Sequence, residues 1–131
     1  MHENFFHTLK VYYEDTDAGG VVYYANYLKY LERARTEFLH SFGITNKLLI
    51  DEHGVLIIVK SCNIEYLKPA KLEDNLEITS RVKSLSKTSF VINQKIKKDN
   101  ILISSANLHL VIVSKNGKPT KIPEILVKYL Q

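Results

Sequence analysis

The sequence predicts an α+β domain in which a five-stranded antiparallel sheet packs against one long helix, in the order β-α-β-β-β-β. One stretch alone has apolar residues at helical spacing, and the four extended segments that follow it have no helix between them. The links between those segments are short. Short links join neighbouring antiparallel strands, whereas parallel strands need a crossover of a dozen or more residues.

The first strand is predicted over residues 5–14, which mix aromatic and β-branched side chains. It ends at Asp15-Thr16-Asp17-Ala18-Gly19-Gly20. Aspartate and glycine are typical of turns, and glycine lets a backbone approach another group closely. We therefore expect a loop here.

The helix follows the loop, because apolar residues then recur every three or four positions. Asn26 is a candidate cap for its start, and Gly43 is a natural residue just past its end. The apolar residues at this spacing are Tyr27, Leu31, Ala34, Phe38 and Phe42.

The remaining strands follow a short apolar connection at residues 44–50. Alternating apolar and polar residues indicate strands with one buried face. The predicted strands are 55–66, 76–85, 89–96 and 101–113, with links at 68–75, 86–88 and 98–100. Asn116-Gly117 then turns the chain toward a C-terminal helical turn at 125–130.

Length and composition favour a single globular domain over residues 1–131. The chain has a mass of 15.1 kDa, 45% hydrophobic residues and 24% charged residues, which excludes a disordered or collagen-like protein. The formal net charge of +4 and pI of about 9.1 are compatible with anionic ligands, an acidic carrier protein, a membrane surface or weak nucleic-acid binding. Charge alone does not choose among these.

Cysteine and histidine usage argues against disulfides and metal sites. Cys62 is the only cysteine, so no intramolecular disulfide is possible, and we expect it in the core. None of His7, His40, His53 and His109 has metal-ligand spacing. We expect no signal peptide, no transmembrane segment and a cytoplasmic location, since no apolar run approaches ~20 residues.

The loop at residues 12–27 carries the strongest chemical signal, because it joins carboxylates to a helix start. Unpaired N–H groups at a helix N-terminus can hold an oxyanion, and a preceding aspartate can supply the attack on a carbonyl. The alternative is that Asp15 and Asp17 only cap a turn. A phosphatase with the Asp-x-Asp spacing is a further alternative, but such enzymes need a parallel sheet.

The run from Tyr13 to Tyr23 resembles the signature of the 4-hydroxybenzoyl-CoA thioesterase family. The helix segment Glu32-Arg33-Ala34-Arg35-Thr36-Glu37 resembles one branch of it, the Tol-Pal-associated (YbgC-like) acyl-CoA thioesterases. Residues 66–70 and Asp74 also fit the link between the second and third strands of that branch. The resemblance covers essentially the whole chain.

This resemblance implies a hotdog fold, in which the sheet wraps around the long helix, and hydrolysis of acyl-CoA without metal or cofactor. It implies active sites at a dimer interface, often in a dimer of dimers (a homotetramer), and a role in lipid metabolism. Asp17 would be catalytic, as nucleophile or general base, and Asp15 structural. Backbone N–H groups at Tyr23 and Tyr24 would bind the carbonyl, and Gly19, Gly20 and Val21 would form the substrate loop.

Coenzyme A would be held by basic and hydroxyl side chains, for which the candidates are Lys60, Lys68, Lys87, Thr88 and Ser89. Many members of the branch carry histidine where this chain has Tyr24. The acyl group and the carrier, coenzyme A or acyl carrier protein, stay open. So does a non-catalytic hotdog module that binds acyl-CoA or acyl carrier protein; no nucleic-acid partner is expected.

Overall fold

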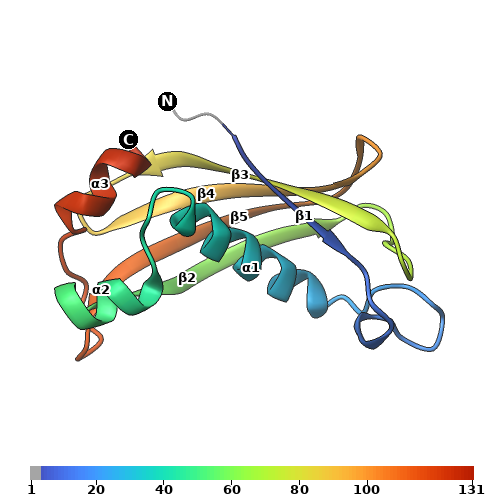
Figure 1. Ribbon diagram of the computed structural model, residues 1–131, viewed down its shortest axis with the longest axis horizontal. Helices are drawn as coiled ribbons and strands as arrows, with labels where there is room; N and C mark the ends of the chain where they lie inside the picture. The colour runs from blue at the N-terminus through green and yellow to red at the C-terminus, as the bar shows by residue number, and fades with distance from the viewer. Residues whose placement is uncertain (1–3) are drawn as a thin grey trace.

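Five strands and one long helix dominate the computed structural model, which describes residues 4–131 (Figure 1). The α+β prediction is confirmed. In chain order the elements are β1 (Phe5–Lys10), the 3-10 turn η1 (Tyr13–Asp15), α1 (Asn26–His40), α2 (Asn46–His53), β2 (Val55–Tyr66), β3 (Asn75–Leu85), β4 (Ser89–Lys98), β5 (Ile101–Ser114) and α3 (Glu124–Leu130).

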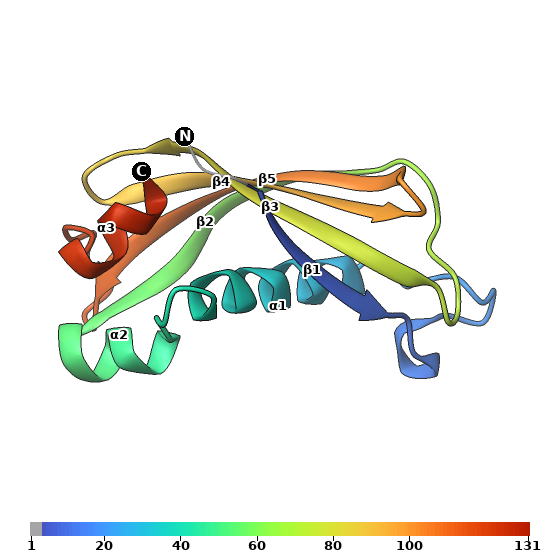
Figure 2. The ribbon, with the colours of Figure 1, turned by 45° about the horizontal axis from the view of Figure 1, so that its top comes forward.

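The sheet has the strand order β1-β3-β4-β5-β2, and every neighbouring pair is antiparallel. This excludes the parallel-sheet phosphatase. Strands β1 and β2 are the two edges. Figure 2 shows the sheet arching over α1, with α2 and α3 at one end of the arch and the loop before α1 at the other.

Helix α1 provides the centre of the core, because its apolar face is buried under the sheet. Tyr30, Leu31 and Ala34 are each at most 1% exposed. The helix packs most closely over β3 and β1 and lies farther from β2. The predicted cap is wrong: Ala25 precedes the helix, and the Asn26 side chain donates to the Asp15 carbonyl instead (2.9 Å).

Strand β1 ends at Lys10, four residues earlier than predicted. The Tyr12 N–H donates to Asp15 Oδ2 (2.9 Å), and the Asp15 N–H donates to the Tyr12 carbonyl (3.0 Å). These two bonds close the chain into η1. A local side-chain bond therefore outweighs the strand preference of the aromatic residues.

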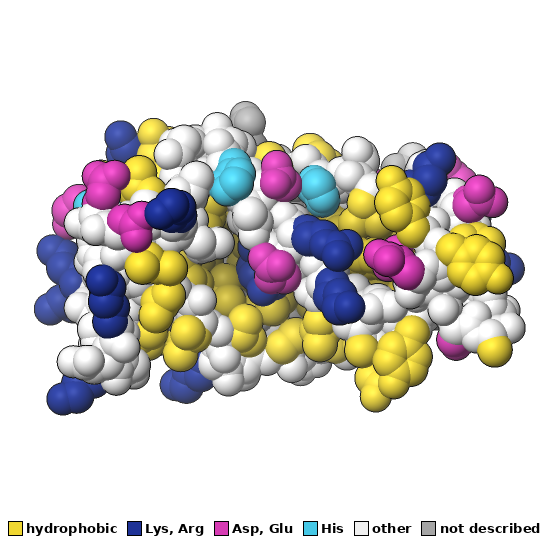
Figure 3. All heavy atoms as spheres, turned by 60° about the horizontal axis from the view of Figure 1, so that its bottom comes forward, with side chains coloured by type: hydrophobic (Ala, Val, Ile, Leu, Met, Phe, Trp, Pro, Cys, Tyr) yellow, Lys and Arg dark blue, Asp and Glu magenta, His cyan; other side chains and the backbone are white. Residues whose placement is uncertain are grey.

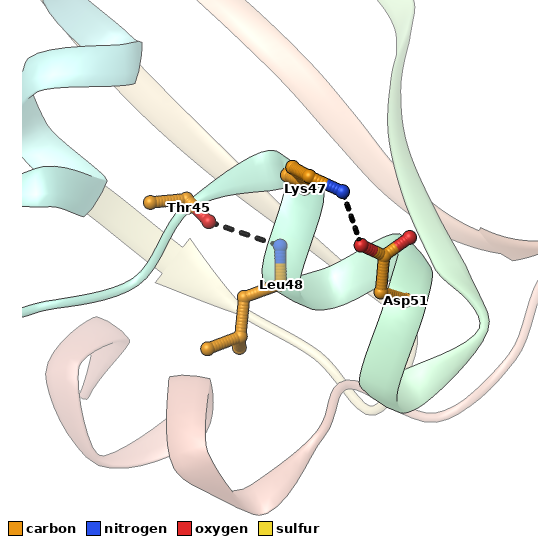
Figure 4. Close-up of polar contacts among 4 residues, drawn as sticks. All are labelled: Thr45, Lys47, Leu48 and Asp51. Carbon is orange, nitrogen blue, oxygen red and sulfur yellow. Dashed lines mark hydrogen bonds and ion pairs between the residues drawn. The ribbon is translucent and has the colours of Figure 1, made fainter.

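A second helix, α2, occupies the segment predicted as an apolar connection (Figure 4). The Thr45 hydroxyl accepts the Leu48 N–H (2.9 Å) and caps the helix start, and Lys47 pairs with Asp51 (2.6 Å). Gly54 ends it with a φ of +65°. The cap and the glycine were signals in the sequence that the prediction did not use.

Cys62 is exposed, so its predicted place in the core is wrong. It lies on edge strand β2, on the face that points toward α1, opposite buried Leu108 of β5. Because α1 is displaced from β2, this face of the strand is only partly covered. Although Cys62 is exposed overall, partial desolvation raises the pKa of its thiol, and nearby Arg35 partly offsets this.

The C-terminal segment folds back along the core as α3, confirming the predicted helical turn. Leu126 and Leu130 are buried, and Tyr129 stacks on Phe42 with ring centroids 4.3 Å apart. Over residues 4–131, no helix combines the length and the apolar character needed to span a bilayer.

Candidate active site

A small hairpin places Asp17 at its tip, immediately before α1. Thr16 pairs with Val22, the Asp17 N–H donates to the Val21 carbonyl (2.9 Å), and the Gly20 N–H donates to the Asp17 carbonyl (3.0 Å). Gly20 has a φ of +78°, a conformation that other residues adopt only at a cost. The Asp-x-Asp loop therefore has a defined shape.

The Asp17 carboxylate has one oxygen engaged and one without a hydrogen-bond partner among the described residues. Its Oδ1 accepts the Gly19 N–H (2.8 Å), which fixes the orientation of the group. A Cβ at position 19 would lie 3.3 Å from Oδ1, so glycine gives the carboxylate room. The side chain is exposed.

Asp15 ties this hairpin to the start of α1. Its side chain holds η1 together, while its carbonyl accepts the Tyr23 N–H (3.0 Å) and the Asn26 side-chain amide (2.9 Å). The buried side chain of Tyr30 lies near the Asp15 carboxylate. Its hydroxyl has no partner at hydrogen-bond distance in the described chain, but burial, followed by the nearby Asp15 carboxylate, raises the pKa of Tyr30.

Two backbone N–H groups at the start of α1 have no acceptor among residues 4–131: those of Tyr24 and Ala25. The next three N–H groups donate to the carbonyls three residues earlier, and the Tyr23 N–H is taken by Asp15. Of the two residues predicted to bind a carbonyl, only Tyr24 therefore has its N–H free. Sequence reasoning missed Ala25, because only the cap geometry shows which N–H groups stay unpaired.

A shallow hollow of about 260 Å³ lies beside the helix start. Tyr24, Tyr27 and Tyr66 contribute aromatic walls, and the Tyr24 and Tyr66 rings meet edge-on with centroids 6.1 Å apart. The Tyr27 hydroxyl accepts the Ala70 N–H (3.1 Å), and burial raises its pKa. Lys68 also lines this hollow.

The other candidate coenzyme A residues lie elsewhere. Lys60, Thr88 and Ser89 share a second hollow of about 260 Å³ with His109, whose Nε2 is 3.0 Å from the Ser89 hydroxyl. This hollow is on the face of the sheet away from α1, since β5 residues alternate and Leu110 faces the helix. Lys87 is exposed nearby, and its carbonyl accepts the Ile122 N–H.

The site combines an exposed carboxylate, on the hairpin that leads into α1, with two free N–H donors at the start of that helix. Such groups suit attack on a carbonyl whose oxygen becomes negative. The acidic, cysteine and histidine side chains of residues 4–131 form no group of three that could hold a metal ion.

Comparisons with known proteins show the family of this chain. Residues 11–130 match the model of the thioesterase-like superfamily. The acyl-CoA thioesterase YbgC of Haemophilus influenzae is 35% identical over 95% of this chain and 92% of its own. The acyl-CoA thioester hydrolase YbgC of Escherichia coli is 41% identical over 91% and 90%. The crystal structure of a 4-hydroxybenzoyl-CoA thioesterase variant bound to 4-hydroxybenzoyl-CoA superposes with a TM-score of 0.90 at 20% identity, covering 98% of this chain and 99% of that one.

Proposed function

The chain belongs to the thioesterase-like superfamily and has its hotdog fold, and from that premise we propose that Asp17 is the carboxylate that drives thioester hydrolysis. The protein is an acyl-CoA thioesterase, similar to the YbgC enzymes over more than nine-tenths of its length. The observation that supports the role of Asp17 is that its carboxylate keeps one oxygen free on the hairpin that leads into α1, at whose start two N–H groups are also free.

Two routes fit one free carboxylate oxygen. As a nucleophile, Asp17 attacks the thioester carbonyl, the C–S bond breaks, the thiolate leaves and is protonated, and water then hydrolyses the mixed anhydride. As a base, Asp17 takes a proton from water while the water oxygen attacks the same carbon. Both give free acid and coenzyme A. Repeated turnover in ¹⁸O-labelled water separates them, because only the anhydride route can place the label in Asp17.

The Tyr24 and Ala25 N–H groups would hold the carbonyl oxygen as it gains charge. They stand where the helix dipole is positive, and the aligned dipoles favour an anion. Tyr24 also brings an aromatic ring to the hollow, so its side chain would contact the acyl group. Gly19, Gly20 and Val21 would border the bound thioester.

We propose a homodimer, alone or within a dimer of dimers, that covers the site. In the single chain Tyr13 and Tyr24 are 83% and 61% exposed, and within residues 4–131 edge strand β2 has no partner on its outer side. Unpaired edges and exposed aromatic groups are usually covered in assemblies. Because Cys62 is the only cysteine and lies on β2, its oxidative cross-linking would report pairing of this edge with a second copy.

Coenzyme A would approach through Lys68, beside the helix start, with its phosphates near Lys60, Lys87, Thr88 and Ser89 of the same or a second copy. Alanine at Lys68 would then raise KM. An acyl carrier protein remains the alternative carrier, given the basic charge of the chain. We also propose that residues 1–131 act as one cytoplasmic domain in lipid metabolism.

The test is hydrolysis of short, long and aromatic acyl-CoAs, followed with a thiol-reactive dye. The exposed Cys62 must first be titrated, because it consumes dye. Asp17→Asn keeps the shape of the side chain and the Gly19 contact but lowers basicity and nucleophilicity. We expect kcat to fall by roughly 10²- to 10⁴-fold.

Asp51→Asn is the matched control, because Asp51 is a surface carboxylate on α2. Circular dichroism must show that both variants are folded. Equal activity in wild type and Asp17→Asn would remove Asp17 from the mechanism. Binding of acyl-CoA without turnover by folded wild type would favour the non-catalytic module.

A further inference from the structure

An open seam runs between α1 and edge strand β2. Six β2 side chains lie on the face turned toward the helix. Val55 is buried, and the other five form a mostly apolar row: Ile57, Val59, Cys62, Ile64 and Tyr66. A β-bulge at Lys60 shifts the register, so that Val59 and Cys62 point to the same side although they are three residues apart. Since α1 packs over β3 and β1, the row is only partly covered. Figure 3 looks onto this side and shows a hollow with a hydrophobic interior.

The row of β2 side chains extends from the hollow at the proposed reaction centre to a second, partly open cavity. At one end Tyr66 contributes to the hollow beside Tyr24. At the other end Ile57 and Val59 line a cavity of about 90 Å³ under the second half of α1. Phe38, Leu39 and Leu110 are also in its wall. The polar and charged side chains of the wall are Glu32, Arg35, Thr36 and Asn46.

Arg35 is the cation in that wall, and no carboxylate in the described chain lies within 4.0 Å of its guanidinium. Its one hydrogen-bond partner is Oε1 of buried Gln94, at 3.1 Å. Glu32, one turn away, accepts a bond from Thr36 instead (2.7 Å). Burial lowers the pKa of Arg35, although Glu32 partly opposes this.

Gln94 holds the guanidinium in place from the sheet. Its amide nitrogen donates to the Leu31 carbonyl and to the Ser80 hydroxyl, both at 3.0 Å, so its oxygen must point toward Arg35. The remaining N–H groups of Arg35 have no partner in the described chain. Glu32 also lines the cavity but forms no ion pair with Arg35 in the described chain. A fixed, half-buried cation with free donors in a largely apolar cavity is a recognition group for an anion.

We infer that Arg35 determines acyl specificity, by selecting acyl groups that carry a carboxylate remote from the thioester. The inference rests on the proposed function, which places the thioester at the start of α1. Arg35 is nine residues beyond Asn26 (35 − 26), about 14 Å along the helix axis. A plain alkyl chain in the seam would remove water from the guanidinium without replacing it, whereas a carboxylate would form a charge-assisted pair.

The test compares ω-carboxyacyl-CoAs with straight-chain acyl-CoAs of the same carbon number, in wild type, Arg35→Leu and Arg35→Lys. We expect wild type to favour the better-fitting carboxylated substrate in kcat/KM by roughly ten- to hundredfold. In Arg35→Leu the preference should reverse, and Arg35→Lys should keep part of it. Arg33→Leu is the control, an exposed arginine of α1 outside the cavity wall.

Binding of non-hydrolysable thioether analogues, measured by calorimetry, gives the same ratio without any chemistry. If wild type hydrolysed none of these thioesters, the proposed function would be refuted, but the binding measurement would still test the role of Arg35. An analogue ratio that is the same in wild type and Arg35→Leu would overturn the inference. So would an equal loss on both substrate series, which would show a packing role, or a change in subunit number in Arg35→Leu, which would show an interface role.

Discussion

Replacing Gln94 by leucine tests whether the polar cluster under α1 stabilises the fold. The side chain is fully buried and makes three hydrogen bonds: one with the Arg35 cation and two with neutral groups of Leu31 and Ser80. A bond to a charged group contributes about 1.5–3 kcal/mol and a neutral one about 0.5–1.5 kcal/mol. Leucine recovers part of this through apolar burial, so we expect a net loss of about 3 kcal/mol.

Urea unfolding followed by circular dichroism measures this loss, at fixed protein concentration because an oligomer gains stability by mass action. Asn93→Leu is the matched control, because it also replaces an amide side chain by leucine, one residue earlier in β4 and on the opposite face. The Asn93 amide donates to the Ala106 carbonyl and to Asn107 Oδ1. That variant should lose no more than about 1 kcal/mol. If Gln94→Leu lies within 1 kcal/mol of Asn93→Leu, the cluster does not contribute to stability as argued.

Three further substitutions test the loops that carry the site. Burial alone would raise the pKa of Asp74, but the bonds from Lys98 and from the Lys71 N–H outweigh it and lower the pKa. Wild type should therefore be more stable than Asp74→Asn by the full amount above about pH 4, and the difference should disappear as the pH falls through the lowered pKa. Acid titration of the free energy of unfolding measures this difference. Gly20→Ala should cost about 1 kcal/mol in thermal unfolding, because its φ is +78°. Gly19→Ala should change stability less but lower kcat, since its Cβ presses on the Asp17 carboxylate; unchanged kcat would show that this oxygen needs no fixed position.

Periodicity and turn residues sufficed to predict most of the sheet. The bounds of β2 match the prediction, and β3, β4 and β5 differ by at most two residues at either end. Two errors have a common cause. In η1 and α2 a single side chain, Asp15 or Thr45, bonds to a nearby backbone N–H and overrides the local pattern. Such bonds depend on exact backbone placement, which residue type alone does not supply.

The candidate site was predictable in its residues but not in its geometry. The family resemblance pointed to Asp17 and the glycines, and the structure places them on one hairpin joined to α1. Which N–H groups stay free depends on how the chain enters the helix, so Ala25 could not be found from its type. The wrong prediction that Cys62 is in the core has a similar origin. Alternating apolar residues predict which face of a strand points toward the helix, but they do not predict whether the helix covers that face.

The position of α1 links the proposed chemistry to the inferred specificity. Helix α1 packs over β3 and β1 and not over edge strand β2, where Val59 and Cys62 stay exposed. This leaves an apolar face for another group, and Arg35 lines the cavity between the second half of the helix and that strand. An acyl group that fills the seam would thus complete the core on one side, while the start of the same helix would bind the carbonyl. Substrate binding should therefore raise the melting temperature of Asp17→Asn, and acyl groups that reach Arg35 should raise it more than shorter ones.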